Sequence, residues 1–164
     1  MELNEFLLKT AFACMSCDGE IAKEELDLIR SMSKVNNLFG NIDIDKCLGV
    51  LVEEINQKGK GFLKQYLHSL TQLSLSEDDE IKIANVAVQM ILEDKKIEYS
   101  EIKFFKVIRA NLTHVTDDVL LDRIEGVDDM FLAQDIKSSY EYIYDDYFCS
   151  VELTNLKLPE KLGD

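Results

Sequence analysis

The sequence contains the stretch Asp18-Gly19-Glu20-Ile21-Ala22-Lys23-Glu24-Glu25, and a matching stretch occurs at Asp94-Lys95-Lys96-Ile97-Glu98-Tyr99-Ser100-Glu101. The two align without a gap, because position 94 follows position 18 by 76 residues and aspartate, isoleucine and glutamate recur at the same places. Each copy is a short acidic turn that joins two amphipathic stretches, in which apolar residues recur at steps of three and four. The sequence therefore predicts one helix–turn–helix hairpin that is used twice.

The residues up to position 115 follow the same helical periodicity. The helices predicted from it span residues 3–17, 22–36, 43–57, 62–75, 77–94 and 98–112. Two of them lie between the hairpins, and the single proline, Pro159, falls near the end of the chain. Since each hairpin has an apolar face that needs a covering face, we predict an all-α, pseudo-two-fold bundle of about seven to eight helices.

The end of the chain has a weaker pattern. We interpret residues 116–164 as an acidic C-terminal extension that packs on a helical domain formed by residues 1–115. Short helices are predicted after Thr116 and over residues 128–137. Tyrosines at 140, 142 and 144 alternate with other residues, which is typical of a strand, although a helix is the alternative. Residues 151–158 also alternate and are expected to lie on the surface.

The charge of the chain restricts its partners. The formal net charge is −14, which argues against nucleic-acid binding because phosphate recognition needs a positive surface. No apolar run approaches the ~18 residues of a membrane helix, so direct membrane insertion is not expected. The acidic start lacks the basic region of a signal peptide. We therefore expect a cytoplasmic protein whose four cysteines are reduced thiols.

The first turn follows a helix rich in small residues, Ala11-Phe12-Ala13-Cys14-Met15-Ser16-Cys17. This helix with the following Asp-Gly-x-Ile-x-x-x-Glu motif, present twice, resembles the tellurite-resistance TerB-like domain over residues 3–112. The resemblance implies an all-helical fold with internal two-fold symmetry, acidic helix junctions proposed to bind metal ions, and a place in bacterial stress responses. The second copy departs from the motif at Lys95, where glycine is expected, and Lys96 adds another positive charge beside it.

Carboxylates of the two turns are the candidate metal ligands. They are Asp18, Glu24, Glu25, Asp94, Glu98 and Glu101. Carboxylate oxygens suit a hard divalent cation, and two related turns could converge on one ion. The alternative is helix capping, in which Ala22 is the cap position and Glu25, three residues on, bonds free N–H groups at the helix start, with Glu98 and Glu101 in the same roles in the second turn. A complete calcium loop is not expected, since Cys14 and Ser16 stand where such a loop needs oxygen ligands.

Other residues give weaker signals. Cys14 and Cys17 form a C-x-x-C that could be a redox pair or half a zinc site, but Cys14 falls on the core face of the predicted helix, where a thiol packs as a small apolar group. His68 and His114 are isolated and are interpreted as surface or helix-end histidines rather than ligands. The aromatic run from Tyr140 to Phe148 could dock a partner or pack over the core.

These features favour a non-enzymatic interaction or sensor module of a bacterial stress response, with a protein partner and with contacts that a divalent cation could assist. No catalytic triad, nucleophile elbow or phosphate-binding glycine loop occurs in the sequence. The competing hypothesis is a metal-dependent, hydrolase-like enzyme that uses the carboxylates of the acidic turns. A structural domain whose partner covers the acidic C-terminal face is the third.

Overall fold

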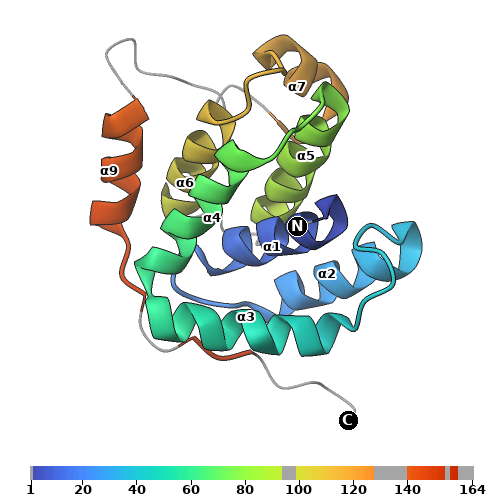
Figure 1. The fold of residues 1–164 in the computed structure, drawn as a ribbon, viewed down its shortest axis with the longest axis vertical. Coiled ribbons are helices and arrows are strands. Elements are labelled where there is room, and N and C mark those ends of the chain that lie inside the picture. Colours follow the sequence, from blue (N-terminus) through green and yellow to red (C-terminus); the bar gives the residue numbers. More distant parts are fainter. Residues whose placement is uncertain (1, 94–98, 128–139, 154–155, 159–164) are drawn as a thin grey trace.

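The computed structural model describes residues 2–93, 99–127, 140–153 and 156–158 (Figure 1). Within these residues every regular element is a helix and no strand occurs, which confirms the predicted all-α bundle. The eight helices of the described residues are α1 (Leu3–Ser16), α2 (Lys23–Asn36), α3 (Ile44–Lys58), α4 (Lys60–Gln72), α5 (Glu77–Glu93), α6 (Tyr99–Ala110), α7 (Asp117–Arg123) and α9 (Tyr140–Ser150). None of them combines the length and the apolar character needed to cross a bilayer.

Helix α1 is the most deeply packed element of the bundle. From Phe6 to Cys17, every residue except Lys9 is buried. A helix that is buried on all sides needs neighbours on all sides, and α1 contacts α2, α3, α4, α5 and α6. Its buried hydroxyl at Thr10 donates to the Phe6 carbonyl oxygen at 2.9 Å and shares a 2.8 Å hydrogen bond with the Tyr66 hydroxyl.

The two predicted hairpins, α1–α2 and α5–α6, cover each other. Helices α1 and α5 make the most extensive contact of the fold. Helix α2 also contacts α5 and α6 also contacts α1, so each hairpin's second helix reaches the first helix of the other. This reciprocal packing is what an internal two-fold relation requires. The pair α3–α4 covers α1, while α7 packs on α5 and α9 packs on α6 (Figure 1).

Helix boundaries differ from the predictions mainly between α3 and α4. A break over residues 58–61 and a helix over 62–75 were expected, but the break is the single residue Gly59, with φ of +58°, and α4 runs from Lys60 to Gln72. Glycine adopts this left-handed conformation at no steric cost. The predicted short helix after Thr116 is present as α7, whereas the helix predicted over 128–137 lies outside the described residues.

The preference for an extended segment over the tyrosine run was wrong, because residues 140–150 form helix α9. The alternating pattern also contains helical spacing, and the structure uses it. The ring centroid of Tyr144 lies 5.9 Å from that of Tyr140 and 4.6 Å from that of Phe148, so rings four residues apart pack in tilted contacts along one side of the helix. Burial of Tyr147 and Phe148 against the bundle then selects the helix over the strand.

The segment after α9 is anchored rather than lying loosely on the surface. Residues 151–158 were expected to lie on the surface, and the burial of Val151 and Leu156 shows that the described part of this segment packs against the bundle. Asn56 of α3 donates its side-chain amide to the Leu156 carbonyl oxygen at 2.9 Å and accepts from the Leu156 N–H at 2.8 Å. Lys60 also donates to the Phe148 carbonyl oxygen at 2.6 Å. Polar groups of α3 and α4 thus hold this segment along α3 (Figure 1).

Candidate functional site

The first acidic turn, residues 18–25, is organised by its own polar groups. The Asp18 carboxylate accepts the Glu20 N–H at 2.9 Å, and Gly19 has φ of +88°, which favours glycine. Helix α2 begins after Ala22, and the Glu25 carboxylate accepts the Ala22 N–H at 3.3 Å. Glu25 therefore has the capping role that was the alternative to metal binding. Its neighbour Glu24 points to solvent as an exposed side chain.

The second acidic turn contributes one described ligand candidate. Asp94 and Glu98 lie outside the described residues, so their predicted roles stay predictions. Glu101 lies in the first turn of α6, at the position that matches Glu25 in α2. Both carboxylates are only 1% exposed. The repeat therefore places two glutamates inside the bundle at equivalent helix starts.

Glu25 and Glu101 approach the same pair of thiols. Burial raises the pKa of Cys14 well above its usual value, and the negative charges of Glu101 and then Glu25 raise it further. Burial also raises the pKa of Cys17, with Cys14, Glu101, Asp18 and Glu25 adding to the effect. Cys17 donates its thiol to the Cys14 carbonyl oxygen at 3.1 Å. These thiols are protonated, buried and free, as expected for core packing, and they lack the low pKa of a reactive cysteine.

Among the described residues, no group of three or more His, Cys, Asp and Glu side chains has the arrangement of a metal site. The six predicted ligands therefore divide into three kinds. Glu25 and Glu101 are buried at helix starts, Asp18 orders its own turn beside the exposed Glu24, and the other two fall outside the described residues.

The C-terminal segment covers the first turn. The Tyr147 hydroxyl of α9 donates to the Cys17 carbonyl oxygen at 2.7 Å. A Cβ atom built at Gly19 would lie 2.9 Å from the Glu152 carbonyl oxygen, so only glycine fits there without displacement. The turn that carries the recognisable motif is consequently packed against residues 147–152.

A second buried carboxylate cluster joins α5 to the loop after α6. Glu80 is 2% exposed and accepts the backbone N–H groups of Thr113, His114 and Val115 at 3.3, 2.8 and 3.1 Å. Its Oε2 also lies 2.6 Å from the Nδ1 of His114, whose side chain is 56% exposed. The sequence showed His114 as isolated, because its partner stands 34 residues away. The contacts fix the loop against α5, beside a cavity of ≈ 190 Å³ lined in part by Leu70 and Leu73.

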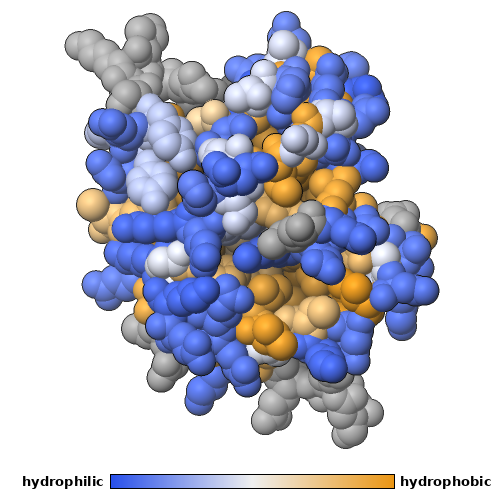
Figure 2. Space-filling model, in the orientation of Figure 1, coloured by the Kyte–Doolittle hydropathy of each residue, from blue (hydrophilic) through white to orange (hydrophobic). Residues whose placement is uncertain are grey.

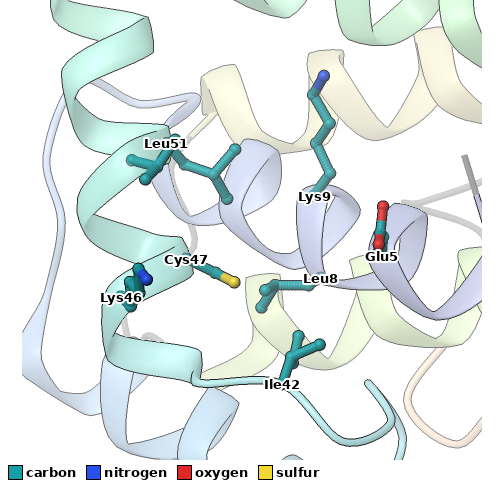
Figure 3. A pocket seen from close by; sticks show the side chains of 8 residues that line it. Glu5, Leu8, Lys9, Ile42, Lys46, Cys47 and Leu51 are labelled. Carbon is teal, nitrogen blue, oxygen red and sulfur yellow. The ribbon is translucent and has the colours of Figure 1, made fainter.

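An open hollow lies between α1 and α3, and no motif in the sequence marked it. Its volume is ≈ 380 Å³ and we call it the α1–α3 groove. The residues that line it are Glu5, Leu8, Lys9, Ile42, Lys46, Cys47, Val50 and Leu51. In Figure 3, the Cys47 thiol points toward Leu8, with Ile42 beside them. Figure 2 shows apolar surface over this part of the molecule.

A signal for the groove exists in the sequence of α3. Val50, Leu51 and Val52 are consecutive, and a helix cannot turn three successive residues toward one core face. Val50 is 56% exposed as a result, whereas Leu48 of the same helix is fully buried. Val50 also lines the groove, so its exposed surface continues the apolar lining, and continuous apolar patches, unlike single exposed residues, mark interaction sites.

Comparison with known proteins gives no further assignment: no family model, no curated protein and no solved structure matches the chain.

Proposed function

We propose that the chain is a non-enzymatic interaction module whose protein partner docks in the α1–α3 groove. The observation that carries the proposal is the groove itself, an open hollow of ≈ 380 Å³ with an apolar floor and an exposed valine on its rim. Concave apolar sites with a few polar groups are the usual form of binding sites. The resemblance of the repeated turns to TerB-like domains supports a role in a bacterial stress response in the cytoplasm.

The burial of the carboxylates supports placing the contact at the groove rather than at the acidic turns. Glu25 and Glu101 are enclosed within the fold, and the C-terminal segment covers the backbone at Gly19. The groove offers accessible side chains from two helices instead. In an alternative form of this proposal, the partner binds at the first acidic turn, through Asp18 and Glu24 and with the help of a divalent cation.

The test is capture of partners from a lysate of the source organism by the immobilised protein and by two matched variants. Val50→Asp puts a charge into the groove, and Val35→Asp makes the same change at a 76% exposed valine of α2, outside it. We expect a defined partner to be recovered with the wild type and Val35→Asp and to be lost with Val50→Asp. Equal recovery with all three proteins would rule out the groove. Asp18→Lys is tested alongside them. If it is the only variant that fails to recover the partner, the contact lies at the first turn.

A further inference from the structure

The α1–α3 groove carries two ammonium groups without a carboxylate partner in the described part of the chain. No Asp or Glu oxygen described lies within 4.0 Å of the Nζ atom of Lys9 or Lys46. Lys9 instead places its Nζ 5.4 Å from the ring centroid of Phe62. Glu5 is the one carboxylate among the described residues that line the groove, so the lining carries more positive than negative charge although the net charge of the chain is −14.

The two lysines belong to opposite walls of the groove. Lys9 comes from α1 and Lys46 from α3, and in Figure 3 the Lys9 side chain extends away from Cys47 and Lys46. Because the two labelled lysine side chains lie apart in Figure 3, a ligand with carboxylates at separate places suits them better than a ligand with a single carboxylate. A ligand with carboxylates on both sides of an apolar stripe can satisfy both while its apolar side chains fill the floor.

We propose that the occupant of the groove is an acidic amphipathic helix of the partner protein. This proposal rests on the function proposed above and names the chemistry of the partner. A helix that lays its apolar side chains into a groove is an established mode of recognition, and acidic residues on its flanks meet Lys9 and Lys46. Glu5 also lines the groove, and its carboxylate would repel acidic residues of the partner that lie next to it.

Local charge, rather than net charge, governs this contact. The net charge of −14 repels an acidic partner at long range, but at physiological ionic strength charges are screened beyond about 8 Å. Within that distance the partner's carboxylates meet the two lysines. The net charge of the chain alone predicts a preference for a basic ligand. A measured preference for an acidic ligand would therefore be evidence that the ligand binds beside the two lysines of the groove.

The test measures binding of two fluorescein-labelled helical peptides by fluorescence anisotropy. Both carry leucines in an i, i+3, i+4, i+7 pattern; one has glutamates flanking the leucines and its twin has lysines at the same positions. We expect the protein to bind the acidic peptide at least about tenfold more tightly than the basic twin, the equivalent of about 1.4 kcal/mol. The double variant Lys9→Glu, Lys46→Glu is expected to reverse that preference.

A matched control separates the groove from overall charge. Lys34 and Lys82 are exposed lysines of α2 and α5 that do not line the groove. The double variant Lys34→Glu, Lys82→Glu changes the net charge equally, and we expect it to alter binding of the acidic peptide by less than about threefold, since rim charges act locally. Val50→Asp is expected to abolish binding of the acidic peptide.

Three outcomes would overturn the proposed occupant. The first is binding of the basic twin that equals or exceeds binding of the acidic peptide, and the second is that neither peptide binds. The third is that dodecanoate binds more tightly than the acidic peptide and depends on the two lysines, which would assign the groove to a small amphiphilic carboxylate. Partner capture that depends on Val50 would still stand in each case and would support the interaction module with a different ligand. If no partner is captured but the protein still prefers the acidic peptide, the proposed interaction module would be contradicted, while the ligand preference of the groove would stand.

Discussion

The two ends of α1 meet very different surroundings. At its C-terminal end, Cys14 and Cys17 are enclosed by the buried Glu25 and Glu101 and by the C-terminal segment. Near its N-terminal end, Leu8 and Lys9 line an open groove. The closed end carries the motif that is recognisable in the sequence, and the open end carries none. A repeated motif can therefore record the needs of the fold, while the surface available to a partner lies elsewhere.

The largest expected effect comes from opening the closed end. Tyr147 is fully buried, contacts the ring of Phe104 at 4.9 Å and bonds the Cys17 carbonyl oxygen. We expect Tyr147→Ala to lower the free energy of unfolding by about 4 kcal/mol, as other large aromatic deletions do. Tyr147→Phe removes the hydroxyl alone and should cost about 1 kcal/mol.

Urea denaturation at neutral pH measures both variants. A loss of less than 1 kcal/mol for Tyr147→Ala would show that the C-terminal helix adds little to the bundle, and the closed end would then be accessible.

Raising the pH should also destabilise the closed end. The pKa values of Cys14 and Cys17 are raised in the folded state, so above the unfolded value of about 8.5 the unfolded chain releases protons that the folded chain retains. Stability is then full below pH 8.5 and falls as the pH rises, by about 3 kcal/mol for the two thiols together at pH 9.5. Urea denaturation under reducing conditions at pH 7.5 and 9.5 measures this loss.

The double variant Cys14→Ala, Cys17→Ala is the control for the pH effect. Its stability should change with pH by about 3 kcal/mol less than that of the wild type over the same interval. An identical pH dependence for the two proteins would mean that other groups account for it and that the thiols ionise normally.

Glu25 and Glu24 are adjacent carboxylates that differ in burial, and they test whether the first turn is structural. Glu25→Ala leaves the Ala22 N–H without its side-chain partner and is expected to cost about 2 kcal/mol. Glu24→Ala, at an exposed position, should change stability by less than about 0.5 kcal/mol. Thermal unfolding compares them. Equal effects of the two substitutions would contradict the capping role.

The repeat and the helical periodicity were sufficient to predict the bundle, because both depend on local patterns. The paired hairpins, the burial of Cys14 and the capping alternative for Glu25 could all be inferred from spacing. The helix at Tyr140–Ser150 could not, because its tyrosines satisfy two periodicities and only contact with α6 decides between them. Local signals are ambiguous where long-range packing makes the choice.

The site was less predictable than the fold for a related reason. The groove combines Leu8 and Lys9 with Lys46 and Val50, which come together only when α3 packs on α1. The bonds of Glu80 to residues 113–115 likewise join segments distant in sequence. The sequence pointed instead to acidic residues that are contiguous, and these serve the helix starts.

Added metal ions test whether the closed end retains a second role. A ligand at 100 times its Kd adds about 2.7 kcal/mol to stability, enough to raise the Tm by several degrees in a chain of this size. Asp18 is bonded within its turn, and Glu25 and Glu101 are buried at the helix starts, which leaves Glu24 as the one exposed candidate among the four described. We therefore expect Ca²⁺, Mg²⁺, Mn²⁺ or Zn²⁺ at 1 mM to shift the Tm by less than about 1 °C relative to EDTA. A larger rise that disappears in Asp18→Asn would restore the cation hypothesis.

The smallest effect on stability is expected at the open end, and it separates binding from folding. Val50 is 56% exposed, so Val50→Asp should cost less than about 0.5 kcal/mol. Ile55 of the same helix is 1% exposed, and Ile55→Asp buries a charge and should cost more than about 4 kcal/mol. Urea denaturation measures both. A large loss for Val50→Asp would mean that the groove is part of the core and that lost binding reports unfolding. A small loss of stability, together with loss of peptide binding, would mean that the buried side of α3 stabilises the fold and that its groove-lining side binds the ligand.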